Sequence, residues 1–508
     1  MSVIKITDLT FGYDGSSQNV FEELNLTMDS NWRLGLVGRN GRGKTTLLKL
    51  LSQAQQDPAH IQASQKFLYF PHPVQDMQQT PMEIFHDLCP LAEDWELLCE
   101  LSLLDLDTEN ELYERPFASF SPGERAKILL ASLFVYPNGF LLLDEPESHM
   151  DEAARKSLAS YLKAKKGFIL VSHDRMLLDE VTDHTLSIEK QQVRVTAGSF
   201  SVWYAVSEQE GKSLQAKNEQ LKKEIGRLSE AERRSSSWAN AAEKQTRKSQ
   251  PNEKIDRGFV SHKAAKAMKR SKNIEKRTNK AIEDKKGLLE NLEESEAIRM
   301  EILPTHTRRV LALENVQVFY DENPVNEKPL SLDIQPGERV QLAGPNGCGK
   351  SSLIRAVMQG DVRYSGQIQK SSGLVISQVR QDLSDMKGAL REFASAFGAD
   401  QSRFFMLLRK MGMEREIFDQ DLSSLSMGQK KKAAIAASLC KPAHLYVWDE
   451  PLNHLDVISR MQIEEMILES QPTMLFVEHD EVFGGKIATK VIDVTDGTVR
   501  EIESPLSQ

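Results

Sequence analysis

The chain has 508 residues, which is too many for one hydrophobic core and predicts about three domains. Its composition, 40% apolar and 27% charged, is that of a globular protein, and no stretch approaches the about 18 uninterrupted apolar residues of a membrane span. The N-terminal segment lacks the basic and apolar regions of a secretory leader. No CxxC pair occurs, which argues against a disulfide framework, a zinc site or an iron–sulfur site built from Cys89, Cys99, Cys348 and Cys440. We therefore expect a protein of the reducing cytoplasm.

The formal net charge of −10 is unevenly distributed. Between Lys244 and Lys280 there are 13 Lys and Arg residues against 3 Asp and Glu, a local balance of +10 that leaves −20 on the rest of the chain. An acidic body with one concentrated basic segment predicts a local contact with a polyanion.

Two halves of the chain repeat one order of motifs. The first half contains GRNGRGKTT from Gly38, FSPGE from Phe120, FLLLDEP from Phe140 and LVSHD from Leu170. The second contains GPNGCGKSS from Gly344, LSMGQ from Leu425, LYVWDEP from Leu445 and FVEHD from Phe476. Lys44 and Lys350 are 306 positions apart, and Asp144 and Asp449 are 305 apart. One nearly constant offset indicates a duplicated domain.

Each half contains the phosphate-binding pattern G-x-x-x-x-G-K-[ST]. Its glycines let backbone N–H groups surround phosphates, and the following helix directs its positive N-terminus at them. Lys44 and Lys350 would reach the β- and γ-phosphates, and the hydroxyls of Thr45 and Ser351 would ligate Mg²⁺. The predicted ATP-binding residues of these loops are Gly38, Asn40, Gly41, Gly43, Lys44, Thr45 and Thr46, and Gly344, Asn346, Gly347, Gly349, Lys350, Ser351 and Ser352.

The runs FLLLDE and LYVWDE each predict a buried parallel strand that ends in two acids, the usual place for chemistry in open α/β sheets. The first acid, Asp144 or Asp449, is expected to hold Mg²⁺, through water. The second acid, Glu145 or Glu450, is expected to position or deprotonate the attacking water.

Residues 207–303 have no counterpart in the repeat. Apolar residues recur there every seven positions, first at Leu214, Leu221 and Leu228 and later at Ile274, Ala281 and Leu288. This spacing predicts two helices, about 207–247 and 259–302, packed antiparallel around a turn at 249–258. A helix of about 40 residues reaches about 60 Å, more than a connector needs. The alternative is a solvated linker with charged faces that binds nothing specific.

FSPGE and LSMGQ each precede a helical pattern and could be plain N-caps. They resemble the signature sequence of ATP-binding cassettes. The resemblance implies that the signature of each cassette addresses the γ-phosphate of the ATP held by the other, through Ser121 and Gly123 in the first half and Ser426 and Gly428 in the second.

The same resemblance implies roles for three further kinds of residue. His173 and His479 match the switch histidine that contacts the γ-phosphate, and would otherwise be strand-end histidines without a special role. Tyr13 and Tyr320 match the aromatic residue that stacks on adenine, although an early strand aromatic is commonly packing alone. The glutamine that links the Mg²⁺ site to the helical subdomain corresponds to Gln381, and in the first half both His72 and Gln75 remain candidates.

In the family, two cassettes pair head to tail. One site would combine Lys44 and its neighbours with Ser426 and Gly428, and the other would combine Lys350 and its neighbours with Ser121 and Gly123. The first signature has Pro122 where glycine is usual, and DEPESHMD departs from the more typical DEPLNHLD. We therefore expect two unequal sites.

The order cassette, basic helical segment, cassette resembles the F subfamily of ATP-binding-cassette (ABC-F) proteins over essentially the whole chain. The expected fold is α/β, with P-loop NTPase cassettes at 1–206 and 304–508 and a helical hairpin at 207–303 whose tip lies at about 248–260. The segment DRGFVSHKAAKAMKRSKNIEKR, 256–277, is similar to the linker of the antibiotic-resistance (Vga/Lsa-type) members. Only 47 residues separate His72 from Phe120, too few for the extra arm of the housekeeping translational-throttle members.

This resemblance implies an ATPase that uses ATP and Mg²⁺, occupies the ribosomal E site and places its linker tip near the peptidyl-transferase centre. There it would promote the release of lincosamide, streptogramin A or pleuromutilin drugs. The partners would be 23S rRNA and P-site tRNA, with no membrane subunit and no DNA, and one chain would suffice because its own cassettes pair. A basic hairpin suits an RNA-walled cavity, where cationic side chains neutralise phosphates. The expected rRNA contacts are Lys244, Arg247, Lys248, Lys254, Arg257, Lys263, Lys266, Lys269 and Arg270.

Three alternatives remain open at this point. The main one is a housekeeping ribosome factor of the same family without a resistance role. A transporter ATPase with a separate membrane subunit would have little use for the basic segment. A DNA-repair or chromosome-structuring ATPase would split one cassette or carry zinc cysteines, whereas both halves here are complete.

Overall fold

The computed structural model describes residues 2–13, 19–54, 59–106, 110–148, 150–189, 192–248, 300–305, 307–320, 323–326, 328–345, 347–358 and 362–502. The chain divides into two compact units. One unit consists of Met1–Trp203 and Ala297–Gln508 and contains both halves of the repeat, and the other consists of Tyr204–Glu296.

The first cassette is built on a six-stranded sheet in the order β5-β6-β7-β3-β8-β9. Neighbouring strands are parallel except β8 and β9, which are antiparallel. A second, antiparallel sheet has the order β2-β1-β4. The strands are β1 Val3–Phe11, β2 Phe21–Asp29, β3 Arg33–Gly38, β4 Ile61–Gln62, β5 Lys66–Phe70, β6 Gly139–Asp144, β7 Phe168–Val171, β8 His184–Glu189 and β9 Gln192–Ala197.

The second cassette repeats this topology. Its main sheet has the order β15-β16-β17-β13-β18-β19, again with one antiparallel strand at the end. Its smaller sheet has the order β11-β10-β12, with β14 also paired to β10. The strands are β10 Leu311–Tyr320, β11 Asn323–Pro324, β12 Leu330–Ile334, β13 Arg339–Ala343, β14 Tyr364–Lys370, β15 Ile376–Val379, β16 Leu445–Asp449, β17 Met474–Val477, β18 Lys490–Asp493 and β19 Val499–Glu501. The predicted tandem α/β cassettes are confirmed.

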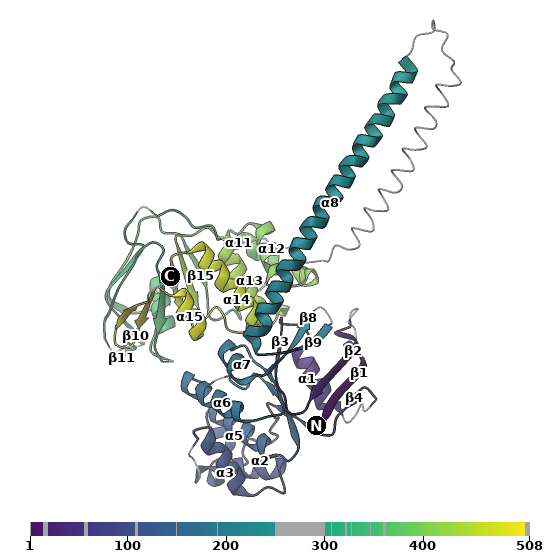
Figure 1. Cartoon of the computed structure of the whole chain (residues 1–508). Coiled ribbons are helices and arrows are strands. Elements are labelled where there is room, and N and C mark those ends of the chain that lie inside the picture. Colours follow the sequence, from purple (N-terminus) through teal and green to yellow (C-terminus); the bar gives the residue numbers. More distant parts are fainter. Residues whose placement is uncertain are drawn as a thin grey trace. The chain divides into compact units, whose positions relative to one another are not determined.

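A group of helices is inserted between the first two strands of each main sheet. In the first cassette these are α2 Pro81–Leu88, α3 Asp94–Leu103, α4 Glu111–Glu114, η2 Phe117–Ser119 and α5 Pro122–Val135. In the second they are α11 Leu390–Phe397, α12 Gln401–Lys410, η3 Arg415–Asp419, η4 Leu422–Ser424 and α13 Met427–Cys440. Figure 1 shows α2, α3 and α5 lying together as a helical subdomain.

The remaining cassette helices each follow a strand of the main sheet. They are α1 Lys44–Ser52, α6 Glu152–Ala164 and α7 Arg175–Val181 in the first cassette, and α10 Lys350–Met358, α14 Val457–Ser470 and α15 Glu481–Ile487 in the second. The two parallel strands that precede the acid and histidine motifs are apolar because helices cover both faces of such a sheet. Strand β17 is buried at every position, and so is β7.

Each cassette packs its sheets and helices around a hydrophobic core. The core of the first cassette joins the small sheet to α1 and the main sheet through residues such as Phe21, Leu47 and Phe140. The second cassette has one core between its two sheets and another between the main sheet and the helical subdomain, the latter centred on Tyr446 and Trp448. These cores fix the carboxyl ends of the central strands, where the motifs lie.

A long helix, α8 Phe200–Lys248, follows the first cassette. Its first turn is attached there, because Phe200 and Trp203 are buried and the Ser201 N–H donates to Asp179 Oδ1 at 2.7 Å. At about 1.5 Å per residue, its 49 residues extend for about 70 Å. The predicted helix over 207–247 is confirmed.

The rest of the segment between the cassettes is described only at its end. The predicted turn at 249–258 and the second helix lie outside the described residues, apart from the last residues of that helix. There the prediction is wrong, since Met300–Leu303 is not helical. The Leu303 N–H donates to the Ala443 carbonyl at 3.0 Å, and Met300 is buried in the core of the second cassette, so this stretch joins the cassette.

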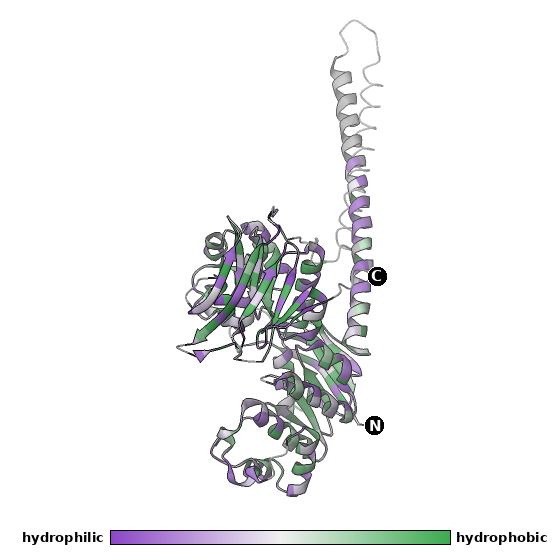
Figure 2. Cartoon of the chain, turned by 90° about the vertical axis from the view of Figure 1, so that its left-hand side faces the viewer, coloured by the Kyte–Doolittle hydropathy of each residue, from purple (hydrophilic) through white to green (hydrophobic). Residues whose placement is uncertain are grey.

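Hydropathy follows this division. Figure 2 shows hydrophobic residues concentrated in the strands of the sheets, whereas hydrophilic residues predominate along the described part of α8. Among the described residues, no helix combines the length and apolar character needed to cross a bilayer.

Candidate ATP sites

Both P-loops connect a strand of the main sheet to a helix. In the first, β3 ends at Gly38 and α1 begins at Lys44, and in the second, β13 leads to α10, which begins at Lys350. The residue before each lysine requires glycine. Gly43 has φ 95°, and a Cβ there would lie 2.6 Å from Val20 Cγ1; Gly349 has φ 97°. The positive φ at this glycine lets each loop turn into the N-terminus of the following helix, the feature that a phosphate site uses.

The two P-loop lysines make equivalent contacts. Lys44 Nζ donates to the Gly38 carbonyl at 2.8 Å and to Asn40 Oδ1 at 3.3 Å. Lys350 Nζ donates to the Gly344 carbonyl at 2.8 Å and to the Pro345 carbonyl at 2.9 Å. Both ammonium groups thus lie inside their loops. The other predicted P-loop residues occupy the same loops and helix starts, except Asn346, which lies outside the described residues.

The acid pairs lie at the carboxyl ends of β6 and β16, as predicted. In the first cassette the Glu145 carboxylate lies 2.8 Å from His173 Nε2, and this hydrogen bond lowers the pKa of Glu145. Burial lowers the pKa of His173, against the opposing effect of Glu145. A neutral imidazole beside an ionised carboxylate can orient that carboxylate without neutralising it.

The second cassette holds its acid differently. Glu450 Oε1 is 3.5 Å from His479 Nε2, while Glu450 Oε2 accepts from Gln381 Nε2 at 2.8 Å and from Asn453 Nδ2 at 2.7 Å. The hydrogen bond from His479, followed by that from Gln381, lowers the pKa of Glu450. The His479 side chain is 39% exposed, against 13% for His173. The two acid–histidine pairs are therefore unequal.

Both second acids have a strained backbone. Glu145 has φ 50° and Glu450 has φ 45°, in the left-handed region that non-glycine residues seldom adopt. The same conformation in both halves indicates that the fold imposes it, and such strain is concentrated at functional sites.

The expected metal ligands lie beside each other in the second cassette. The Ser351 hydroxyl donates to Asp449 Oδ1 at 3.2 Å, and burial raises the pKa of Asp449. In the first cassette the Tyr69 hydroxyl donates to Asp144 Oδ2 at 2.9 Å, which the sequence did not suggest. Burial and Asp144 raise the pKa of Tyr69, so its proton stays on the phenol.

Strand register identifies the first-cassette counterpart of Gln381. Phe70 is paired with Leu143, the residue before the first acid pair, and Val379 is paired with Trp448, the residue before the second. Counted along the strands, His72 corresponds to Gln381, since each lies two residues past the last paired residue, and Gln75 does not. Burial, followed by the charge of Lys66, lowers the pKa of His72.

Both signature serines are N-caps. Ser121 Oγ accepts from the Glu124 N–H at the start of α5, and Ser426 Oγ accepts from the Gln429 N–H at the start of α13, both at 3.3 Å. Each forms a capping box with its third helical residue. Pro122 occupies the first turn of α5, where its missing N–H costs nothing.

The first P-loop contacts the second cassette directly. The Asn40 N–H donates to Asp456 Oδ2 at 3.1 Å, and Asn40 Nδ2 donates to the His454 carbonyl at 2.9 Å. A Cβ on Gly428 would lie 2.6 Å from the His454 carbonyl oxygen and 3.3 Å from Asn40 Nδ2. The loop over 452–456 and the signature glycine of the second cassette are thus packed against the first P-loop, which is the head-to-tail arrangement.

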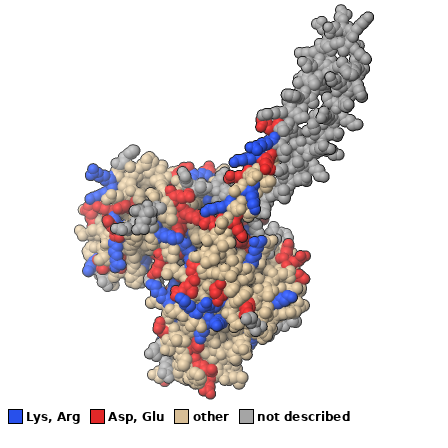
Figure 3. Space-filling model, in the orientation of Figure 1, with Lys and Arg blue, Asp and Glu red and all other residues tan. Residues whose placement is uncertain are grey.

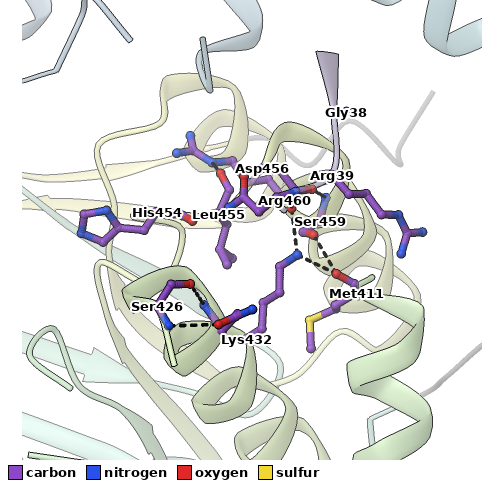
Figure 4. A network of polar contacts seen from close by, with 12 residues as sticks. Gly38, Arg39, Met411, Ser426, Lys432, His454, Leu455, Asp456, Ser459 and Arg460 are labelled. Carbon is purple, nitrogen blue, oxygen red and sulfur yellow. Dashed lines mark hydrogen bonds and ion pairs between the residues drawn. The ribbon is translucent and has the colours of Figure 1, made fainter. Parts of the chain in front are cut away.

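A buried ion pair supports this contact from behind. Lys432 Nζ lies 2.8 Å from Asp456 Oδ2, with side chains 2% and 1% exposed, and donates to the Met411 carbonyl at 2.6 Å. Asp456 also caps α14 by accepting from the Ser459 N–H at 2.8 Å. Figure 4 shows Lys432 directed at Asp456 and Met411, with Ser426 nearby and Arg39 approaching from the first cassette.

Three further contacts join the first cassette to the second. Arg39 Nη1 donates to the Lys410 carbonyl at 2.8 Å, and Arg42 pairs with Glu414 at 3.1 Å. Away from the P-loop, Arg175 at the start of α7 pairs with Glu464 of α14 at 2.5 Å. Both side chains of that pair are less than 10% exposed.

The reverse contacts, between α6 and α15 and between the second P-loop and the first signature, are weaker. Lys156 lies 3.5 Å from Glu481, and both side chains are well exposed. In the described part of the chain, no hydrogen bond or ion pair joins the 344–351 loop to Ser121 or Gly123. The structure brings the first P-loop and the second signature together, and it does not bring the second P-loop and the first signature together in this way.

Comparison with known proteins agrees with this geometry. Two segments, residues 21–148 and 328–453, match the ABC transporter family, and together they make up half of the chain. The ribosome protection protein VmlR of Bacillus subtilis is 28% identical over 98% of the chain and 88% of the relative's length. The erythromycin resistance ATP-binding protein MsrA of Staphylococcus epidermidis is 28% identical over 92% and 93%.

The chain is a member of the ABC-F family. Its cassettes are ATP-binding domains, and the protein is an ATPase. A chain in the crystal structure of archaeal ribosomal stalk protein aP1 with archaeal ribosome recycling factor aABCE1 superposes with a TM-score of 0.57 at 17% identity. That alignment covers 96% of this chain and 87% of the other, and it supports the two-cassette fold.

The candidate adenine contacts of this ABC-F protein are unequal. The Tyr13 hydroxyl lies 2.8 Å from Thr46 Oγ1, and the Tyr13 ring packs edge-on against Phe11 with centroids 5.2 Å apart. Tyr320 is 77% exposed at the end of β10. Tyr13 is therefore tied to the first P-loop helix, whereas most of the Tyr320 side chain is exposed to solvent.

The candidate rRNA contacts of the ABC-F protein are described least. Lys244, Arg247 and Lys248 belong to the last turns of α8, and only their backbone is described. The others, Lys254, Arg257, Lys263, Lys266, Lys269 and Arg270, lie outside the described residues. On the face drawn in Figure 3, the described acidic and basic side chains of the cassettes are interspersed.

Several residues of the ABC-F sites were not predicted from sequence. These are the second-cassette residues at the first P-loop, His454 and Asp456, and the pair Arg175 and Glu464. A signal for the first two was present, because DEPESHMD and DEPLNHLD repeat a histidine and an aspartate at matching positions after the acid pair. No signal marked the second pair, whose members are 289 positions apart.

Proposed function

We propose that this ABC-F protein binds the ribosome in an ATP-dependent manner and promotes the release of large-subunit antibiotics. The observation that carries the proposal is the extent of the match to a protein named for ribosome protection, which spans 98% of the chain and so includes the segment between the cassettes. A second relative of nearly equal length is named for erythromycin resistance. These names support a ribosomal role for a two-cassette ATPase.

At each site, ATP would be held by the P-loop of one cassette and the signature of the other. Water attacks the γ-phosphorus, the bond to the β–γ bridging oxygen breaks, and ADP and phosphate leave. Glu145 and Glu450 would orient this water and accept its proton, a role that suits carboxylates whose pKa values are held low. His173 and His479 would each contact the neighbouring carboxylate and the γ-phosphate, and so fix their positions relative to each other.

The residues present fit a magnesium ion. A hydroxyl and a carboxylate oxygen 3.2 Å apart, as in Ser351 and Asp449, are hard oxygen donors of the kind that Mg²⁺ prefers beside a nucleotide. Thr45 and Asp144 would serve in the first cassette, and Gln381 would contribute in the second. When bound, Mg²⁺ offsets the negative charge of the phosphate oxygens.

The cassettes would act as a clamp within one chain. The contacts of Asn40 and Arg175 with the second cassette support intramolecular pairing and therefore a functional monomer. ATP at both sites would complete the interface and hydrolysis would weaken it, because the nucleotide itself bridges the two cassettes. The unequal acid–histidine geometry supports two sites of unequal rate.

The segment between the cassettes would reach ribosomal RNA from the E site. The 49-residue α8 supplies the length, and the +10 balance over 244–280 supplies the charge that neutralises phosphates. The contacts would be made by Lys244, Arg247, Lys248 and the basic residues that follow, with the tip at about 248–260 near the peptidyl-transferase centre. Such a protein works in the cytoplasm.

Drug resistance in a sensitive bacterium tests this function. Inhibitory concentrations would be measured for a lincosamide, a streptogramin A, a pleuromutilin and erythromycin, with the wild-type chain and with the Glu145→Gln/Glu450→Gln variant. We expect an increase for at least one of the first three drugs that disappears in the variant. An unchanged concentration for every drug would contradict the resistance role and favour a housekeeping ribosome factor.

A further inference from the structure

A buried carboxylate lies behind the switch histidine of the second cassette. Glu478 Oε1 accepts from the His479 N–H at 2.8 Å, and Glu478 Oε2 accepts from the Leu452 N–H at 3.1 Å. The side chain is only 6% exposed, and burial raises its pKa against the opposing charge of Arg460. One carboxylate thus ties the backbone of the histidine loop to the backbone of the loop that follows the acid pair.

The first cassette makes a similar link, but there the carboxylate belongs to the loop that follows the acid pair. Glu147 Oε1 accepts from the His173 N–H at 3.2 Å and from the Ser172 hydroxyl. Glu147 is 305 positions before Leu452, and Ser172 is 306 positions before Glu478. The two halves have therefore exchanged which loop supplies the acid, while the buried carboxylate and its bond to the histidine N–H are present in both.

The second-cassette link connects parts of different ATP sites. His479 faces Glu450, at the site of Lys350. The loop that begins at Leu452 continues to the His454 carbonyl and to Asp456, which both accept from Asn40 in the first P-loop. Figure 4 shows this loop beside Gly38 and Arg39 of the first cassette. In the described part of the chain, Glu478 thus joins the backbone N–H of the histidine of one site directly to the loop docked at the other, beside the side-chain link through Glu450 and Asn453.

We propose that Glu478 is a positioning residue that couples the two ATP sites, a proposal that rests on the assignment of those sites. When the His479 backbone shifts with the state of the second site, Glu478 shifts the 452–456 loop with it, and so changes the fit of Asp456 against the first P-loop. Glu147 performs the equivalent task for His173 and the loop that follows the first acid pair. A buried carboxyl group that accepts from both N–H groups can transmit such a shift, because moving either backbone segment moves the side chain that holds the other.

A simple packing role is the competing explanation, and a transplant separates the two. Glu478→Ser removes the link. Leu452→Glu combined with Glu478→Ser rebuilds it from the other loop, in the arrangement that Glu147 and Ser172 have in the first cassette. Glu478→Gln keeps the shape of the side chain and one acceptor oxygen, so it retains one of the two hydrogen bonds.

The measurement is single-turnover ATP hydrolysis by the first site of the full chain. Glu450→Gln silences the second site, and its rate is compared with that of Glu450→Gln/Lys350→Ala, in which the second site also fails to hold ATP. The ratio of the two rates is the coupling, which we expect to be about tenfold, a typical size for linked sites. Thermal unfolding of each variant checks that it is folded.

We expect Glu478→Ser to reduce the ratio to within about twofold of one, Glu478→Gln to give an intermediate ratio, and the transplant to restore it to within about threefold of wild type. An unchanged ratio in Glu478→Ser, or a ratio lost equally in the transplant, would overturn the coupling role. Absence of any hydrolysis in the Glu450→Gln background would instead refute the site assignment. If Glu478→Ser does not fold, the comparison of Glu478→Gln with the transplant decides the matter in the same way.

Discussion

Substituting Lys432 tests the structural basis of the docked first site. Lys432→Met keeps the length and much of the volume of the side chain but removes the charge that faces Asp456 at 2.8 Å and the donor that reaches the Met411 carbonyl at 2.6 Å. Burial acts to raise the pKa of Asp456, and Lys432 holds it well below its usual range; in the variant this opposing charge is gone and the buried carboxylate loses its main compensation. Its remaining partners would be the N–H groups of Ser459 and Asn40.

The expected cost follows from burial. Removing one partner of a buried pair that is 2% and 1% exposed costs about 3–5 kcal/mol, because the other charge is left without compensation. Adding Asp456→Asn removes that charge while an amide oxygen still accepts from the Ser459 N–H. The double variant is therefore expected to recover about 2 kcal/mol relative to the sum of the single changes.

The first cassette supplies a matched control. Lys127 stands 305 positions before Lys432, is also buried, and donates to the Leu104 carbonyl at 2.7 Å. Lys127→Met should cost only about 1–3 kcal/mol, the value of one charge-assisted hydrogen bond. Hydrogen-exchange mass spectrometry of the full chain measures the loss of backbone protection in each variant. It is read in α5 for Lys127→Met and in α13 and α14 for Lys432→Met. If Lys432→Met lowers protection no more than Lys127→Met does, the reasoning about the buried pair is wrong.

Three further predictions concern single positions. Burial, opposed by the Ser172 hydroxyl, raises the pKa of Glu147 from 4.5 to about 7, so its contribution to stability is fully present below pH 4.5 and is lost as the pH rises through 7, by about 3 kcal/mol. Urea unfolding at pH 5 and pH 8 should show that Glu147→Gln removes this slope, and an unchanged slope would contradict the assignment. Gly428→Ala places a Cβ 2.6 Å from the His454 carbonyl and should lower first-site hydrolysis at least tenfold, about 1.4 kcal/mol or more, whereas Gly485→Ala, with open space, should leave it unchanged. In a Glu450→Gln background, His72→Ala should slow ATP hydrolysis about tenfold, the value of one hydrogen bond to a charged group, and His72→Gln should restore it; equal rates for all three would refute its equivalence to Gln381.

The parts of the molecule that follow local rules could be predicted from the sequence. The cassettes, the P-loops and the acid pairs each carry their signal within a few residues, since a glycine turn or an apolar strand that ends in acids is specified locally. The constant offset added a second, independent test. For the same reason the long helix over 207–247 was predictable from its periodicity, and its predicted partner lies outside the described residues apart from its last residues.

The contacts between cassettes could not be predicted in the same way. Asn40 and Asp456 are 416 positions apart, and each is a common residue type in its own loop. Their pairing depends on how two folded cassettes meet, which no local pattern specifies. The exchanged carboxylates are a similar case, because Glu147 and Glu478 occupy different motif positions and only the backbone N–H that each one binds shows that they are equivalent.

The most direct test of the proposed function is sedimentation of the Glu145→Gln/Glu450→Gln variant with ribosomes in the presence of ATP. Both carboxylates are the groups proposed to accept a proton from water, so the variant should bind ATP, complete the cassette interface and fail to reopen it. We expect it to co-sediment with ribosomes in ATP and to remain in the supernatant in ADP. If it sediments free of ribosomes in both nucleotides, the protein is not an ATP-gated ribosome factor.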